Sequence, residues 1–236
     1  MSEIIVEKIL VGKPKTIDET NSNNPMNREW TSGIFKEETK NPIWLGKTNL
    51  TGDGQADLKH HGGPEKAVFV YPIQHYIHWK EELKINNMNI GAMGENFAIN
   101  GQLEEEACIG DNYKIGEAVV QISQPRQPCW KPARRFQIRD LALLLQNSGR
   151  TGWYFRVLKE GYVKEGQPLI LLERPYPQWT IAKCNEVMHM KKEDLKTSKE
   201  LASCEYLAIN WKRTLNARVE KGEELDVNRR VYGPNI

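Results

Sequence analysis

The feature that most constrains the fold is a change of pattern at Arg174-Pro-Tyr-Pro177. Before it, short apolar runs alternate with glycine, proline and asparagine, which is typical of strands joined by turns. After it, the apolar spacing is helical throughout. We therefore predict a mainly β domain with inserted helices over residues 1–174, followed by a small α-helical domain over residues 175–236. A chain of 236 residues is long enough to bury a core without disulfide bonds.

Local patterns place the elements within these two regions. Runs rich in β-branched and aromatic residues predict strands at 3–11, 30–36, 44–49, 67–71, 118–123, 153–158 and 169–172. Apolar spacing predicts one inserted helix over 72–83, with Pro72 in its first turn, and another from Pro132 to Ser148-Gly149. In the C-terminal region, a single helical stripe contains Leu201, Cys204, Ala208, Trp211 and Leu215. We interpret this stripe as core packing.

Charge and cysteine content narrow the classes of protein. A net charge of +2, with 27% of residues charged, gives no reason to expect nucleic acid or a membrane as a partner. The four cysteines lie far apart, without the close pairs of a disulfide scaffold or a structural zinc site. The chain starts without an apolar signal region, and no apolar run approaches the roughly 20 residues that span a bilayer. We expect a cytoplasmic protein with reduced thiols.

One cysteine has unusual surroundings. The segment from Gln124 to Arg139 contains no acidic residue and five basic ones, with Cys129 near its centre, after a predicted strand and before a predicted helix. Neighbouring cations and the helix dipole both favour the thiolate over the thiol. Such a cysteine is suited to nucleophilic attack, to persulfide carriage or to binding a soft metal. The alternative, a small buried side chain without a function, does not explain the basic cluster.

Two further segments could contact a ligand. Residues 53–66 combine Gly62 and Gly63, which allow close backbone approach, with His60, His61 and Lys66, which could donate hydrogen bonds to an anion. The segment lacks the spacing of a Walker loop or a dinucleotide fingerprint, and adjacent histidines suit a zinc site poorly. An ordinary turn-rich loop remains an alternative.

The second segment is Gly94-Glu95-Asn96-Phe97. Here a polar pair between glycine and an aromatic residue could hydrogen-bond a heterocycle. A turn that leads into a strand explains the same residues equally well.

Taken together, five motifs in order resemble the MOSC family, named after the C-terminal domain of molybdenum-cofactor sulfurase. They are His61-Gly-Gly-Pro-Glu-Lys66-Ala-Val, Gly94-Glu-Asn-Phe97, Ile109-Gly-Asp111, Ile115-Gly116 and Gln124-Pro-Arg-Gln-Pro-Cys129. The C-terminal region looks like the three-helix extension of one branch of that family. The resemblance covers nearly the whole chain and implies a β-barrel-like domain.

The resemblance also implies a cofactor and roles for individual residues. A molybdenum cofactor (molybdopterin) would be held with Cys129 as the protein ligand to the metal, while the pterin dithiolene supplies two more sulfurs. For the phosphate of the cofactor we predict His61, Lys66, Arg126 and Arg134, together with the backbone at Gly62 and Gly63. Asn96 is expected to bond the pterin or to orient the substrate.

The branch with the helical extension is associated with resistance to N-hydroxylated base analogues, which implies a reductase that removes the hydroxyl group from nitrogen. No flavin, haem or iron–sulfur signature is visible, so we expect a separate electron-donating reductase as a partner. His60, Asp57 and Glu95 are the predicted candidates for the proton donor. Two other functions stay open: Cys129 could carry persulfide sulfur to another protein, or the chain could bind the cofactor without catalysis.

Overall fold

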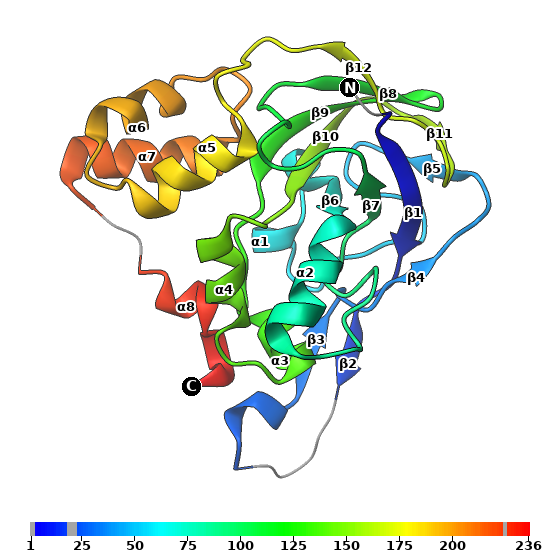
Figure 1. Cartoon of the computed structure of the whole chain (residues 1–236), viewed down its shortest axis with the longest axis horizontal. Helices are drawn as coiled ribbons and strands as arrows, with labels where there is room; N and C mark the ends of the chain where they lie inside the picture. The colour runs from blue at the N-terminus through cyan, green and yellow to red at the C-terminus, as the bar shows by residue number, and fades with distance from the viewer. Residues whose placement is uncertain (1–2, 18–22, 224–225) are drawn as a thin grey trace.

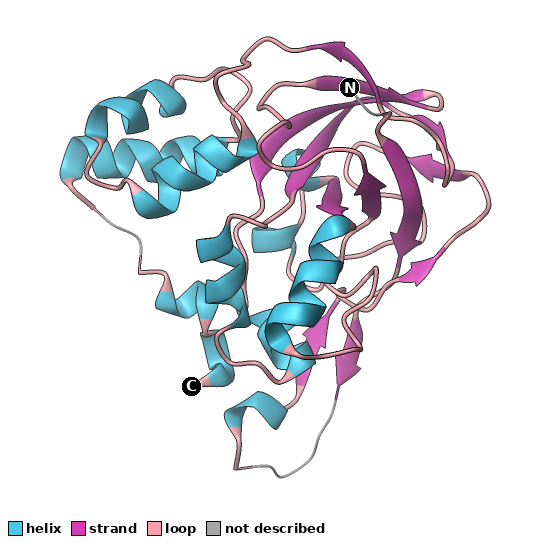
Figure 2. Ribbon diagram, in the orientation of Figure 1, coloured by secondary structure: helices cyan, strands magenta, loops and turns pink. Residues whose placement is uncertain are grey.

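The body of the protein is a strongly curled sheet with helices on its outer side (Figures 1 and 2). The computed structural model describes residues 3–17, 23–223 and 226–236. In spatial order the strands of this sheet are β12 (Ile170–Glu173), β8 (Asn112–Ile115), β9 (Ala118–Pro125), β10 (Trp153–Lys159), β6 (Val68–Pro72), β7 (Phe97–Asn100), β1 (Ile5–Val11) and β4 (Glu37–Glu38). Two small antiparallel pairs lie outside it, β11 (Gly161–Val163) with β5 (Ile43–Leu45) and β2 (Lys15–Ile17) with β3 (Trp30–Ser32).

The sheet curls far enough for β1 to meet the segment before β12. The backbone N–H of Val6 in β1 donates to Gln167 O at 3.0 Å, and Gly166 N–H donates back to Val6 O at 2.8 Å. Leu169 N–H, directly before β12, donates to Ile4 O at 2.8 Å. These bonds use backbone groups that an open sheet would leave unpaired at its edge. The predicted mainly β, barrel-like fold followed by a helical region is confirmed.

One helix is required by the strand order. β6 and β7 are parallel neighbours, and parallel strands need a crossover connection, which is supplied by α2 (Gln74–Leu83). The sequence predicted this helix from Pro72, but Pro72 is still part of β6 and pairs with Ile99. The helix therefore begins two residues later than predicted.

The second inserted helix is two helices. They are α3 (Trp130–Phe136) and α4 (Leu141–Ser148), whereas a single helix from Pro132 was predicted. Gln137 adopts a left-handed backbone conformation, with φ of 56°, and ends α3. Apolar spacing alone did not reveal this break because Phe136 and Leu141 are both consistent with one continuous stripe.

The strands predicted at 3–11, 67–71, 118–123, 153–158 and 169–172 are confirmed as β1, β6, β9, β10 and β12. The predicted strand 30–36 is only three residues long, and the strand predicted at 44–49 lies at 43–45. The strands β2, β4, β7, β8 and β11 were missed. Each of the missed strands has at most four residues, too few for alternation to be recognised.

The C-terminal region contains α5 (Ile181–Asn185), which continues into a π-helical turn (Glu186–Met190), α6 (Leu195–Ala202) and α7 (Ile209–Lys221). Two short elements follow, α8 (Asn228–Val231) and a 3₁₀ turn (Gly233–Asn235). All five residues of the predicted stripe are buried, which confirms core packing, but they do not share one helix: Leu201 lies in α6, and Trp211 and Leu215 lie in α7.

The helical region and the barrel share one core. A single cluster of buried apolar residues runs from Ile122 and Phe155 inside the barrel to Trp179, Cys184 and Trp211 beneath the helices. A second cluster fills the space between the outer face of the sheet and helices α2 to α4. Among the described helices, none is long and apolar enough to cross a membrane.

Hydrogen bonds also join the helical region to the barrel. At the start of α7, Ala208 N–H donates to Ser123 O at 2.9 Å, and Ile209 N–H donates to Glu65 Oε2 at 3.0 Å. Glu65 is the residue before Lys66, in the loop that carries the predicted ligand residues. The position of this loop therefore depends on the helices as well as on the barrel.

Candidate functional site

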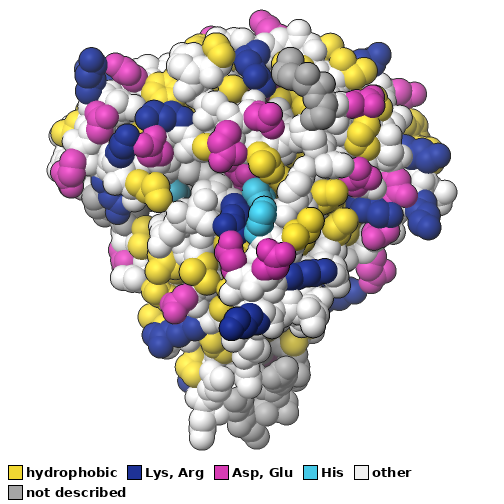
Figure 3. Space-filling model, in the orientation of Figure 1, with side chains coloured by type: hydrophobic (Ala, Val, Ile, Leu, Met, Phe, Trp, Pro, Cys, Tyr) yellow, Lys and Arg dark blue, Asp and Glu magenta, His cyan; other side chains and the backbone are white. Residues whose placement is uncertain are grey.

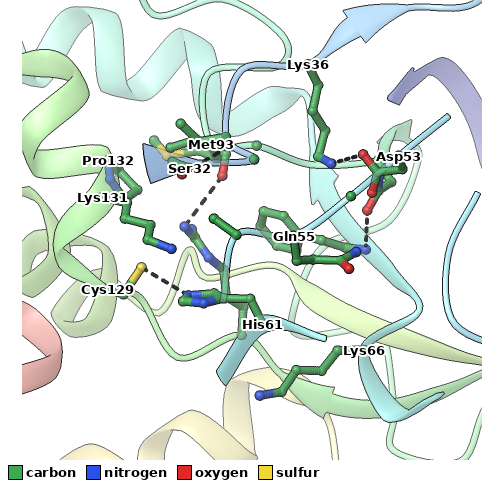
Figure 4. A pocket seen from close by; sticks show the side chains of 18 of the residues that line it. Ser32, Lys36, Asp53, Gln55, His61, Lys66, Met93, Cys129, Lys131 and Pro132 are labelled. Carbon is green, nitrogen blue, oxygen red and sulfur yellow. Dashed lines mark hydrogen bonds and ion pairs between the residues drawn. The ribbon is translucent and has the colours of Figure 1, made fainter. Parts of the chain in front are cut away.

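A pocket opens where β9 passes into α3. Its empty space is about 580 Å³, a volume that includes solvent at the open mouth. The walls come from segments far apart in the sequence, which Figure 4 shows converging. The residues that line the pocket include Lys36, Asp53, His61, Lys66, Phe69, Met93, Asn96, Arg126, Cys129, Lys131 and Tyr154.

Cys129 lies at the junction of strand and helix. β9 ends at Pro125, and Cys129, with extended backbone angles, occupies the N-cap position of α3. Its Sγ lies 3.5 Å from Nε2 of His61, and Lys131 points toward the same region (Figure 4). The structure thus brings the predicted thiol and one predicted cofactor-binding residue into contact.

His61 belongs to the short helix α1 (Leu58–His61), which Asp57 caps by accepting a hydrogen bond from His60 N–H at 3.1 Å. The same carboxylate lies 3.8 Å from His61 Nδ1, because residues four apart share a helix face. Asp57, His61 and Cys129 therefore form a row of carboxylate, imidazole and thiol. The 3.8 Å between Asp57 and His61 is too long for a hydrogen bond, and His61 Nδ1 has no hydrogen-bond partner among the described residues, so Asp57 contributes its charge near His61 rather than an orienting hydrogen bond.

The charge around Cys129 determines its ionisation. Burial alone would raise the pKa of this thiol, but the charge and hydrogen bond of His61 and the charge of Arg126 lower the pKa to about 6. At neutral pH the sulfur is therefore mainly a thiolate, the form that binds metals and attacks electrophiles. The described cysteines Cys108, Cys184 and Cys204 are buried, and burial raises the pKa of each.

The low pKa of Cys129 can be tested by alkylation of metal-free protein. Alkylation of Cys129 should accelerate as the pH rises through about 6, because only the thiolate reacts. Replacing His61 with glutamine removes the charge that does most to lower the pKa of Cys129. The midpoint of the alkylation rate should therefore move toward the roughly 8.5 of an ordinary thiol, and the rate at pH 7 should fall about tenfold or more. Iodoacetamide labelling followed by peptide mass spectrometry measures both values. The exposed neighbour His60→Gln is the matched control, and an unchanged midpoint in His61→Gln would contradict the assignment.

The pocket carries more positive than negative charge. Arg126, Lys66, Lys131 and Lys36 line it, against the single carboxylate of Asp53. Arg126 is only 5% exposed, and its guanidinium lies 4.7 Å above the Phe69 ring. Its Nη1 is buried and has no hydrogen-bond partner among the described residues. Because an unpaired buried donor costs free energy, this atom marks a place for an anionic or strongly accepting ligand.

Lys66 is held in the pocket wall by the turn of Pro64–Lys66. Its Nζ donates to His60 O at 2.6 Å. Burial lowers the pKa of Lys66, and the nearby charges of Glu65, Asp57 and Cys129 oppose that effect. Gly62 and Gly63 do not line the pocket; Gly63, with φ of +94°, makes the turn that directs the chain toward Lys66.

Lys36 and Asp53 form a buried ion pair in the pocket wall that was not predicted from the sequence (Figure 4). Asp53 also accepts hydrogen bonds from Gly12 N–H at 3.0 Å and from Asn96 Nδ2 at 2.9 Å. Burial lowers the pKa of Lys36, although the Asp53 charge opposes this. Asp53 could have been noticed between Gly52 and Gly54, whereas Lys36 carries no local signal.

Asn96 lines the pocket, but its side-chain amide is already hydrogen-bonded within the protein. Its Oδ1 accepts from Phe69 N–H at 3.1 Å, and its Nδ2 donates to Leu10 O and to Asp53. Asn96 therefore positions Asp53 and the backbone of β6, rather than offering a free amide to a pterin as predicted.

Besides Asp57, three other predicted residues lie outside the lining. Glu95 is fully buried behind the wall, where it accepts from Tyr76 Oη and Gly91 N–H, each at 2.6 Å, and burial raises its pKa. Arg134 donates to Asn235 Oδ1 and to backbone carbonyl oxygens and stacks 4.8 Å from the Trp130 ring. Both are held by structural contacts, which explains why neither reaches the pocket.

His60 is the third, and it points outward. Its side chain is 61% exposed and its Nδ1 lies 2.8 Å from Asp57 Oδ2. On the face seen in Figure 3, histidine side chains lie near the centre beside basic ones. Of the two adjacent histidines, His61 is therefore the one that faces Cys129.

Comparison with known proteins agrees with this architecture. The MOSC domain family matches residues 57–170, and the YiiM-like three-helix domain matches residues 179–222. The chain is 38% identical over 211 residues to the uncharacterized protein YflK of Bacillus subtilis, an alignment that covers 89% of this chain and 92% of YflK.

A solved structure and a longer relative extend the comparison. The crystal structure of YiiM from Geobacillus stearothermophilus superposes with a TM-score of 0.76 at 36% identity, covering 92% of this chain and 99% of that one. A protein of Gibberella moniliformis named "Reductase" is 37% identical over 184 residues, which are 77% of this chain but 32% of that protein. With its barrel, its three helices and its thiol pocket, the chain belongs to the MOSC-domain proteins that carry a YiiM-like three-helix domain.

Proposed function

We propose that this protein is a molybdenum-cofactor-dependent reductase of the cytoplasm that removes the hydroxyl group from N-hydroxylated compounds such as base analogues. A separate reductase would supply its electrons. The observation that carries the proposal is the combination, in one pocket, of a single thiolate with a cationic lining and an unpaired buried guanidinium donor.

The thiolate fits a metal that brings ligands of its own. Among the described residues, no three His, Cys, Asp or Glu side chains gather closely enough to hold a bare ion. A molybdenum centre bound to a pterin dithiolene already has two sulfur ligands, so Cys129 alone would complete its attachment to the protein. Soft thiolate is also a donor type that such metals accept.

The rest of the lining fits the organic portion of that cofactor. Arg126, with its free Nη1, and Lys66 and Lys131 offer cationic donors suited to a phosphate. Phe69 and Tyr154 provide flat apolar surfaces against which a ring system can pack. When bound, the cofactor would supply a two-electron redox centre.

The reaction itself needs protons at defined atoms. Reduction of R–NHOH to R–NH₂ consumes two electrons and two protons and releases water. His61, with Nε2 beside the sulfur, and Lys36, whose ammonium group lines the pocket, are the groups that can hold protons there. We propose them in place of the predicted donors His60, Asp57 and Glu95, which lie outside the lining.

The longer fungal relative supports a shared role in reduction. A region similar to this chain makes up about a third of a protein named "Reductase", so other segments accompany it there. We infer that the present chain obtains electrons from a separate protein in a comparable way.

Turnover with an artificial donor tests the proposal without knowledge of the partner. Protein from a host that makes the cofactor is mixed with reduced viologen and an N-hydroxylated adenine analogue, and the amine product is followed by chromatography. We expect one amine for every two electrons consumed. Cofactor-loaded protein that forms no amine from any N-hydroxylated base would contradict the catalytic role and leave a cofactor-binding module.

A second candidate function rests on the acidic thiol. Cys129, with a pKa of about 6 and His61 beside it, also suits a persulfide carrier. A carrier should gain one labile sulfur on Cys129 from a cysteine desulfurase in the absence of metal. Mass spectrometry of the intact protein detects that addition of mass.

A further inference from the structure

The last residues of the chain return to the pocket region after the three helices. The match to the three-helix domain ends at residue 222, and α8 and the final turn lie beyond it. Figure 1 shows this red segment next to α3 and α4, away from the helices that precede it. Val231 and Asn235 are buried there, with 1% and 4% of their surface exposed.

The segment holds the backbone immediately before Cys129. Arg230 in α8 donates from Nη1 to the carbonyl oxygen of Pro128. Its Nη2 donates to Gln146 Oε1 in α4 at 2.6 Å. One guanidinium therefore ties the residue before the thiol to a helix of the barrel domain.

The same segment also holds the backbone immediately after Cys129. Asn235 Nδ2 donates to Trp130 O at 3.2 Å, and its Oδ1 accepts from Arg134 Nε at 2.8 Å. Gly233 lies so close to Trp130 that a Cβ built on it would come within 2.3 Å of the indole ring. Only glycine fits this contact, and its φ of +50° favours glycine as well.

We propose that residues 226–236 are a strap that fixes the backbone on both sides of Cys129. α3 has only seven residues, and so short a helix is not stable by itself, so the direction of its N-cap side chain must come from tertiary contacts. Arg230 and Asn235 are thus positioning residues for the sulfur. The role of this positioning in holding a metal ligand rests on the proposed function. The existence of the strap does not depend on that function.

Hydrogen exchange on the full-length, metal-free protein tests the strap. Arg230→Met keeps the aliphatic stem and removes both hydrogen bonds, and the exposed neighbour Arg229→Met is the matched control. We expect the amides of residues 127–137 to exchange at least about tenfold faster in Arg230→Met, with wild-type rates in Arg229→Met. Asn235→Ala should give the same local effect from the other side of the thiol.

Each outcome bears on a separate element of the proposal. Wild-type exchange over 127–137 in both Arg230→Met and Asn235→Ala would overturn the strap. Faster exchange throughout the molecule would overturn it too, because the effect must be local. In protein from a cofactor-competent host, Arg230→Met should also retain less molybdenum than Arg229→Met, and equal retention would overturn the link to the metal. If the proposed function is wrong, wild type contains no molybdenum while the exchange difference remains.

Discussion

Protein with Cys129 replaced by serine is expected to lose its molybdenum and to turn over N-hydroxylated substrates at least about 100-fold more slowly. Loss of a residue that only supports a metal ligand already costs about 10–100-fold, and here the proposed ligand itself is removed. Serine keeps the size of the side chain, but its hydroxyl is a hard, neutral donor in place of the thiolate whose pKa is about 6. Elemental analysis for molybdenum and pterin fluorescence after oxidation measure the two components of the cofactor.

The buried cysteine Cys108 supplies the control for this experiment. It lies outside the pocket lining, and Cys108→Ser should keep both metal and turnover. Wild-type molybdenum content in Cys129→Ser would contradict the ligand role. Wild-type protein that was supplied with cofactor, yet contains none and instead takes up one sulfur, would favour the carrier function.

Replacing Arg126 with methionine should weaken cofactor retention about 10- to 100-fold, the range expected when a charge-assisted hydrogen bond worth about 1.5–3 kcal/mol is lost. Methionine keeps contact with Phe69 but removes the buried Nη1 donor. It also removes one of the charges that lower the pKa of Cys129, so alkylation at pH 7 should slow as well. The pterin content after dialysis against increasing salt measures retention.

Two substitutions separate charge from geometry at this position. Arg126→Lys keeps the charge but lacks the planar fork, so its retention should lie between wild type and Arg126→Met. Arg139→Met removes an exposed cation of the same basic segment, outside the pocket lining, and should have no effect. Equal loss in Arg139→Met would show that general positive charge, rather than the buried guanidinium, holds the ligand.

The long strands and the thiol were accessible to sequence reasoning because their signals are local. The run that forms β6 is continuously apolar, and five cations near Cys129 stand out in an otherwise balanced chain. The thiolate character predicted from those cations agrees with the direction of the pKa. The dominant charge, however, comes from His61, which is 68 residues away in the sequence.

The same basic segment also shows where local reasoning fails. Arg126, Arg134 and Arg135 look equivalent in the sequence, yet only Arg126 has an unpaired donor beside the pocket among the described residues. Arg134 bonds the C-terminal turn, and Arg135 donates to the carbonyl oxygens of Ile34, Gly91 and Ala92. Tertiary contacts, which composition cannot reveal, decide which cation is free for a ligand.

Lys36 was missed for a related reason. It is the last residue of the strand predicted at 30–36, and its importance comes from pairing with Asp53 inside the pocket wall. A single lysine in a chain with 33 basic residues gives no signal until the fold buries it.

The hydrogen bond from Ile209 N–H to Glu65 bears on how such proteins can be recombined. A chimera that placed these helices on another barrel would deprive the loop beside Lys66 of its anchor, and a gene cut between residues 174 and 175 would split one apolar core in two. A tag or fusion partner therefore belongs away from this junction. An insertion between residues 174 and 175 would disturb both the barrel and the helical region, even though the change in sequence pattern makes this position look like a domain boundary.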